Sequence, residues 1–104
     1  MRTYAFLLCT ALLMSSAMAD IDFSDYHSPS QVDSEMAALE SGFPALAKVM
    51  SIGSSVNGLP IKALKISDNV ATDEADEGDV IFIASIHARE WLSTEMALYL
   101  AEYL

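Results

Sequence analysis

A run of five consecutive apolar residues, VIFIA at positions 80–84, constrains the fold more than any other feature of the sequence. A strand with one face in water alternates apolar and polar side chains, whereas a strand covered on both faces is apolar throughout. Because this run does not alternate, it predicts a covered strand over residues 79–85 in an α/β sheet. Such a sheet needs more layers than this chain can supply, so we expect a truncated part of a larger domain.

Upstream of this run, a group of capping residues predicts a helix. Ser28 is a good N-cap, Pro29 suits the first helical position, and Gln31 completes a capping box with Ser28. Gly42 supplies a stop signal at the other end. We therefore expect a helix over residues 29–41.

A hairpin is expected next, because two strand candidates flank a tight-turn signal. The candidates cover residues 47–56 and 60–67, and Asn57-Gly58 between them is a strong signal for a two-residue turn. The two strands should pair antiparallel.

The last part of the chain has apolar residues at helical spacing after Trp91. This pattern predicts a second helix that continues to the last residues, with Ser93 or Thr94 as its cap. The sequence therefore predicts an α/β fold in the order helix, antiparallel hairpin, central strand, helix.

Residues 1–19 have the pattern of a secretory signal peptide, with a basic start, an apolar stretch and small residues before a cleavage site near Ala19. The apolar stretch is about half of the roughly twenty residues that span a bilayer, so export without a membrane anchor is expected. Cys9, the one cysteine, would be removed with the signal. We expect a secreted or periplasmic monomer that begins at Asp20.

The chain is strongly acidic, with fifteen Asp and Glu against five Lys and Arg and a net charge of −10. This imbalance disfavours nucleic acid or an anionic membrane as a partner. Residues 73–79 alone carry five carboxylates. They are expected to form a solvated loop, since the alternative, a calcium loop, would have an Asp-x-Asp-x-Asp-Gly register that is absent here.

The chemical signal lies in residues 85–91, SIHAREW, where the predicted strand gives way to the predicted helix. Zinc takes imidazole nitrogen and carboxylate oxygen, and a catalytic zinc keeps three protein ligands and a water. His87 and Glu90 have two residues between them, so both could face one ion. The alternative is an exposed histidine that lies near a glutamate by chance. His27, the other histidine, is expected to have a polar surface role.

The segment 86–91, IHAREW, resembles the first metal-binding segment of zinc carboxypeptidases of the carboxypeptidase A and B type. Residues 52–61 and 64–67 are similar to the hairpin that opens their catalytic domain, and the resemblance extends back to Tyr26. It implies that residues 20–104 are the N-terminal portion of a mixed-sheet α/β/α peptidase domain. It also implies one zinc ion per complete domain and peptide or protein C-termini as substrates.

The resemblance implies roles for four residues of this segment. His87 and Glu90 match the first two zinc ligands, and Arg89 matches an arginine that contacts the substrate near the scissile bond. A salt bridge to a carboxylate is the alternative for Arg89. Trp91 matches a position of structural packing.

Other parts of the family pattern have no counterpart in these residues: the third zinc ligand, the groups that hold the substrate's terminal carboxylate, and the general-base glutamate. No catalytic residue is therefore assigned, and the chain is expected to be inactive by itself. One alternative is a small exported acidic protein that binds metal or a partner without catalysis. Another is an acidic exported domain without a site.

Overall fold

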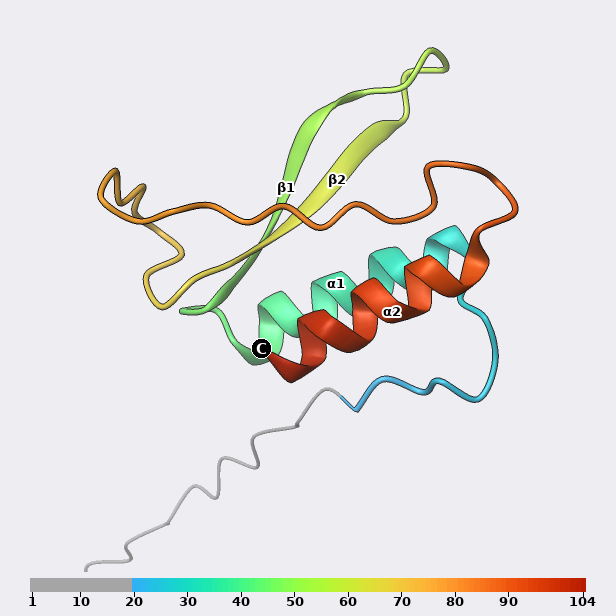
Figure 1. Ribbon diagram of the computed structural model, residues 1–104, viewed down its shortest axis with the longest axis horizontal. Coiled ribbons are helices and arrows are strands. Elements are labelled where there is room, and N and C mark those ends of the chain that lie inside the picture. Colours follow the sequence, from blue (N-terminus) through green and yellow to red (C-terminus); the bar gives the residue numbers. More distant parts are fainter. Residues whose placement is uncertain (1–19) are drawn as a thin grey trace, which may run out of the picture.

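The computed structural model describes residues 20–104. The expected signal peptide at residues 1–19, with Cys9, lies outside the described residues. The described part contains two helices and an antiparallel pair of strands, which confirms the α/β class (Figure 1). In chain order the elements are α1 (Pro29–Gly42), β1 (Ala47–Ser54), β2 (Pro60–Ile66) and α2 (Trp91–Tyr103).

Helix α1 begins with the capping box that the sequence predicts. The Ser28 hydroxyl accepts a hydrogen bond from the Gln31 backbone N–H at 3.4 Å, and the Gln31 side chain accepts one from the Ser28 N–H at 2.9 Å. Two N–H groups that a helix start leaves without partners are thereby satisfied. The helix ends at Gly42, one residue beyond the expected end.

Strands β1 and β2 form the predicted antiparallel hairpin, with Ala47 opposite Ile66 and Ser54 opposite Pro60. Gly58 in the turn has φ of 75°, a left-handed conformation that glycine adopts without a steric penalty. The register shifts between Ser51 and Gly53, as at a β-bulge. Each strand ends slightly earlier than the sequence analysis placed it.

A small apolar core joins the N-terminal segment to both helices. Ile21, Leu39 and Leu98 are its buried members, and α1 packs between β1 and α2. The two helices lie side by side under the hairpin (Figure 1). Ile21 thus fastens a segment without regular structure to both helices.

The segment before α1 is also tied to α2 through polar contacts. The Ile21 N–H donates to the Glu102 carboxylate at 2.9 Å. The His27 N–H donates to one oxygen of Glu95 at 2.8 Å, and His27 Nδ1 lies 2.7 Å from the other oxygen. The predicted surface role of His27 is wrong, because its side chain is buried against a glutamate from the far end of the chain.

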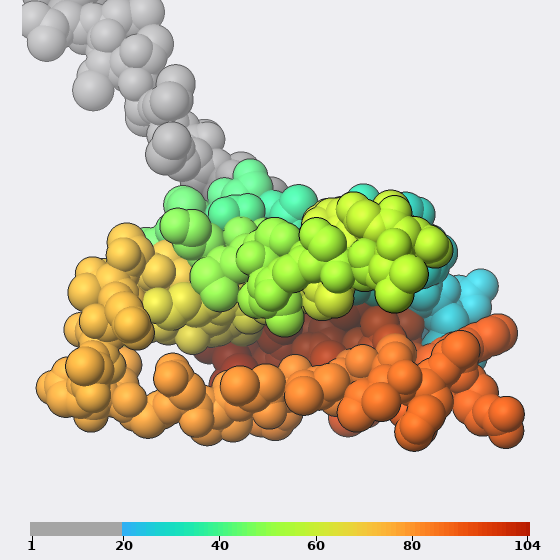
Figure 2. Space-filling model, turned by 90° about the horizontal axis from the view of Figure 1, so that it is seen from above, coloured from blue at the N-terminus to red at the C-terminus, as the bar shows by residue number. Residues whose placement is uncertain are grey.

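The predicted strand over residues 79–85 does not form in the described structure. The segment is extended, but none of its backbone groups joins the β1–β2 ladder. Figure 2 shows it running beside the hairpin, with part of α2 visible between them. A strand requires a hydrogen-bonded neighbour, and none is available to this segment among residues 20–104. Residues 80–83 are accordingly between 65% and 81% exposed.

Helix α2 begins earlier than its predicted caps. Its N-cap is Glu90, and neither Ser93 nor Thr94 caps it, because both already lie within the first turn. The Ser93 hydroxyl instead donates to the Glu90 carbonyl at 2.6 Å. Neither of the two described helices is long and apolar enough to cross a bilayer.

Candidate metal centre

The connection between the extended segment and α2 is a compact turn held by short-range hydrogen bonds. The Glu90 N–H donates to the His87 carbonyl at 3.1 Å. Ser85, just before the turn, has φ of 52°, which is rare for a residue with a side chain. Its N–H donates to the Ser93 hydroxyl at 2.9 Å, and its own hydroxyl contacts that of Thr94. The turn is therefore fastened to the first turn of α2.

His87 and Glu90, the two candidate ligands, face each other within this turn. His87 Nδ1 lies 2.6 Å from Glu90 Oε1, and the His87 N–H donates to Glu90 Oε2 at 3.3 Å. Both side chains are exposed, with 72% of His87 and 44% of Glu90 accessible. An imidazole nitrogen and a carboxylate, the donors that zinc takes, thus converge at the surface.

Arg89 lies between the two candidate ligands and is exposed. Its guanidinium forms no salt bridge with any carboxylate of residues 20–104, so the alternative role considered for it is not realised there. Together with His87, Ala88 and Glu90 it lines an open depression of about 660 Å³.

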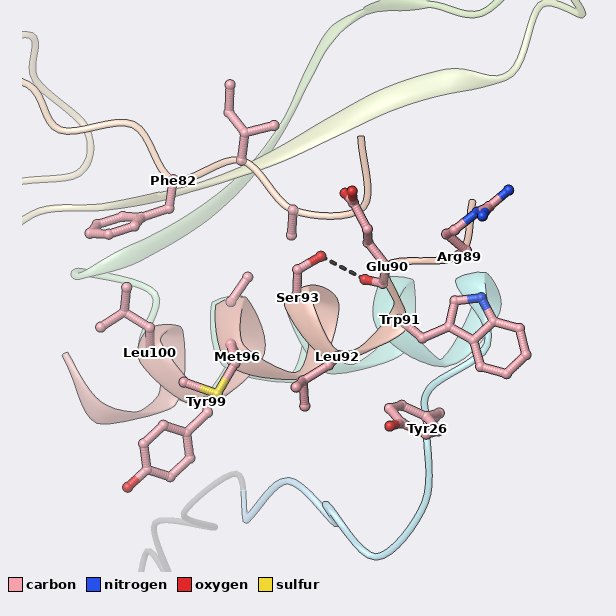
Figure 3. Close-up of a pocket in the computed structure, with 13 residues that line it drawn as sticks. Tyr26, Phe82, Arg89, Glu90, Trp91, Leu92, Ser93, Met96, Tyr99 and Leu100 are labelled. Atoms are coloured by element: carbon pink, nitrogen blue, oxygen red, sulfur yellow. Dashed lines mark hydrogen bonds between the residues drawn. The ribbon is translucent and has the colours of Figure 1, made fainter. Parts of the chain in front are cut away.

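Trp91 is the first residue of α2 and is 62% exposed, so it is not a buried packing residue. Its indole Nε1–H donates to the Ala88 carbonyl at 2.7 Å. Its ring meets Tyr26 edge to face, with the centroids 5.8 Å apart. Figure 3 shows the indole beside Tyr26 and the Glu90 carboxylate on the other side of the chain.

An apolar groove adjoins this turn, between the extended segment and one side of α2 (Figure 3). Its volume is about 910 Å³, and its apolar lining includes Phe82, Ile83, Leu92, Met96 and Leu100. Phe82 and Ile83 belong to the extended segment, which has no paired strand among residues 20–104.

A second group of carboxylates comes together in the acidic region. One oxygen each from Asp68, Glu74 and Glu77 lies within 4.8 Å of the others. The acidic loop predicted from the sequence covers residues 73–79 and leaves out Asp68, although the high carboxylate content of the region was the available signal. Asp68 and Glu77 are exposed and Glu74 is half-buried, as in a solvated loop.

The donor set at His87 and Glu90 fits a zinc ion in type but supplies two ligands. Among residues 20–104, no further histidine or carboxylate joins these two in a cluster that could hold a metal. A catalytic zinc takes three protein ligands, so the described residues provide part of such a site.

Comparison with known proteins places this region in a family. The sequence profile described as zinc carboxypeptidase matches residues 32–104. A zinc carboxypeptidase of Saccharothrix mutabilis subsp. capreolus is 37% identical over 76 residues, which are 73% of this chain and 17% of the relative. A protein of Ajellomyces dermatitidis named as an inactive metallocarboxypeptidase is 37% identical over 87 residues, 84% of this chain and 15% of its own length.

A third relative is carboxypeptidase D of Mus musculus, which is 31% identical over 91 residues. These residues are 88% of this chain and 7% of the mouse protein. The chain therefore spans 17% or less of the length of these three relatives.

Proposed function

Because the chain belongs to the zinc carboxypeptidase family, we propose that it is part of a metallocarboxypeptidase that hydrolytically releases C-terminal amino acids from peptides and proteins. One observation carries the proposal: His87 Nδ1 and the Glu90 carboxylate converge, exposed, within the matched region. The activity is proposed for a protein that contains the rest of the peptidase domain.

His87 and Glu90 would hold one zinc ion, through Nδ1 and the carboxylate oxygens that already face each other. When bound, zinc polarises a carbonyl oxygen and lowers the pKa of its bound water. Two ligands do not complete such a site, and the general base is not among residues 20–104. The 104 residues by themselves are therefore expected to have no peptidase activity.

Arg89 is proposed to contact the substrate beside the scissile bond. Its guanidinium presents five N–H donors in a fixed plane, suited to carbonyl and carboxylate oxygens. It lines the same depression as the two candidate ligands and has no carboxylate partner among the described residues. A peptide that enters this depression would meet its donors without first breaking an ion pair.

The location proposed for the protein is the periplasm or the extracellular space. The support is the sequence pattern of residues 1–19, with cleavage near Ala19. We also propose that the protein is a monomer. Mass spectrometry of the N-terminal peptide of the exported protein tests the cleavage near Ala19, and a peptide that still contains Arg2 would contradict it.

The test of the function uses the protein purified from its native source. Zinc per molecule is measured by elemental analysis, and release of C-terminal amino acids is followed by mass spectrometry before and after chelation. Activity that is lost with the chelator and restored by zinc is expected. His87→Ala and Glu90→Ala should each remove both zinc and activity.

Glu77→Ala is the matched control, because it removes a carboxylate from the group formed with Asp68 and Glu74. It should leave zinc content and activity unchanged. Zinc that is lost in Glu77→Ala and retained in His87→Ala would contradict the assignment of the site.

A second candidate function is that of a non-catalytic member of the family. It is favoured by the similarity to the Ajellomyces dermatitidis protein, which is named as inactive. It is also the alternative that the sequence left open, an exported acidic protein that binds metal or a partner. Stoichiometric zinc without release of any C-terminal amino acid would support this candidate over the enzyme.

A further inference from the structure

We propose that Trp91 is a positioning residue for the metal site, acting through the backbone between the two ligands. The inference rests on the proposed function, since it assigns a role in zinc binding by His87 and Glu90. Ala88 lies directly after His87, and its carbonyl accepts the Trp91 indole N–H at 2.7 Å. Trp91 directly follows Glu90, so this one bond closes a ring that runs from Ala88 to Trp91, contains Glu90 and begins directly after His87.

The hydrogen bond of the Trp91 indole restrains the backbone between His87 and Glu90. Zinc binding depends on the distance between the donor atoms of these two residues. A ligand pair on a short turn binds an ion well only when the backbone holds its donors in place beforehand, because otherwise binding must order the turn. The backbone bond from the Glu90 N–H to the His87 carbonyl is 3.1 Å long. The indole bond is shorter, and its donor and acceptor residues each lie one position further along the chain. It therefore closes a second ring that overlaps the first. Together they hold the His87 and Glu90 side chains on the same side of the turn.

The orientation of the indole is itself supported. Tyr26 meets the ring edge to face at 5.8 Å and an interplanar angle of 75°. Tyr26 lies in the segment that His27 ties to Glu95 of α2. An exposed tryptophan gains little from burial at this place, so the bond to the turn and the contact with Tyr26 account for its position.

The experiment compares zinc affinity in the complete protein and two variants, by competition with a chelator of known affinity. Trp91→Phe keeps an aromatic ring beside Tyr26 and removes the N–H donor. The loss of one net hydrogen bond is expected to weaken zinc binding about three- to tenfold. Lys48→Ala, an exposed substitution on β1, is the control and should change zinc affinity by less than twofold.

A spectroscopic readout separates positioning from general stability. With cobalt in place of zinc, Trp91→Phe should shift the d–d absorption bands, because the ligand geometry has changed, while Lys48→Ala leaves the bands unaltered. Zinc affinity and cobalt bands in Trp91→Phe that equal those of the wild type would overturn the inference. The proposed function would still stand if His87→Ala abolished binding, and would fail if His87→Ala bound zinc normally.

A measurement on the unmodified protein keeps the inference testable if Trp91→Phe does not fold. The indole N–H of Trp91 should exchange with solvent more slowly than a free indole N–H, although the side chain is largely exposed, because it is hydrogen-bonded. Zinc should slow the exchange further. Exchange at the rate of a free indole in the zinc-bound protein would also overturn the inference.

Discussion

Two histidine–glutamate pairs in this chain have nearly the same contact distance and opposite surroundings. His27 and Glu95 lie 68 residues apart in the sequence, with Nδ1 and Oε2 separated by 2.7 Å and side chains that are 5% and 12% exposed. His87 and Glu90 lie three residues apart, with the corresponding atoms separated by 2.6 Å and side chains 72% and 44% exposed.

The surroundings decide what each pair can do. In the buried pair, both Glu95 oxygens already accept hydrogen bonds from His27, so the carboxylate has its partners and joins two distant segments. In the exposed pair, the contact is local, and an exposed ion pair typically contributes about 1 kcal/mol or less. A metal ion can therefore replace the contact between His87 and Glu90 at little cost. The same residue types serve the fold in one place and are available to a ligand in the other.

The largest expected effect comes from removing each histidine in turn. His87→Ala should weaken zinc binding by more than about 100-fold, since even residues outside the ligand shell typically contribute 10- to 100-fold. His27→Ala should leave the zinc content unchanged in the molecules that remain folded. Elemental analysis of both purified variants checks this. Equal zinc loss in the two variants would remove the functional distinction between the pairs.

Breaking the buried pair should instead lower stability. Glu95→Ala leaves the His27 N–H and imidazole without their acceptor in a buried place, which is expected to cost about 2–3 kcal/mol in the free energy of unfolding. Asp33→Ala is the control, because it removes the exposed salt bridge to Lys62, with an N–O distance of 2.8 Å. It should cost less than about 1 kcal/mol.

Denaturant unfolding of the complete protein measures both free energies. If Glu95→Ala were no more destabilising than Asp33→Ala, the buried pair would have no structural role beyond that of a surface contact.

A smaller effect is expected at Ser85, which connects the extended segment to the turn that contains His87 and Glu90. A residue with a side chain in the left-handed region carries a strain of about 1–2 kcal/mol, which glycine avoids. Ser85→Ala and Ser85→Gly both remove the hydroxyl contacts, but only glycine also removes the strain. The free energy of unfolding of Ser85→Gly should therefore be about 1 kcal/mol higher than that of Ser85→Ala. Denaturant unfolding measures both values. An alanine variant of equal or greater stability would mean that the turn does not hold Ser85 at its φ of 52°.

The parts of the fold that the sequence predicts well depend on near neighbours. The capping box of Ser28 and Gln31 and the glycine turn at Gly58 are each decided by residues a few positions apart. The same holds for the candidate ligands, because His87 and Glu90 meet within one turn. The hydrogen bond of the Trp91 indole is also local, but spacing alone does not indicate which carbonyl it would reach.

Two of the predictions that failed depend on distant partners. His27 directly precedes the helix cap Ser28, a position that predicts a surface role, and its partner Glu95 could not be identified without the fold. Residues 80–84 have the composition of a covered strand, yet their pairing requires another strand, and the hairpin does not provide one. The sequence pattern indicates whether a segment needs a buried or an exposed environment. The tertiary structure decides which residues provide that environment.

The smallest effect concerns Asp22, whose pKa is lowered in part by His27 of the buried pair. Hydrogen bonds from the Ser24 side chain and backbone N–H, the latter 2.9 Å long, lower the pKa of Asp22, and attraction to His27 lowers it further. A lowered pKa stabilises the fold above the ordinary carboxyl pKa, and this contribution is lost as the pH falls through the folded-state value. Because Asp22 is fully exposed, the change in stability should be slight.

An NMR titration of the Asp22 side-chain carboxyl carbon measures this pKa directly. Ser24→Ala should raise the pKa more than His27→Ala does, since the hydroxyl bond is the larger cause. His87→Ala, at the exposed pair, should leave it unchanged. A pKa of Asp22 that responds equally to both histidine substitutions would mean that the two pairs are not electrostatically separate.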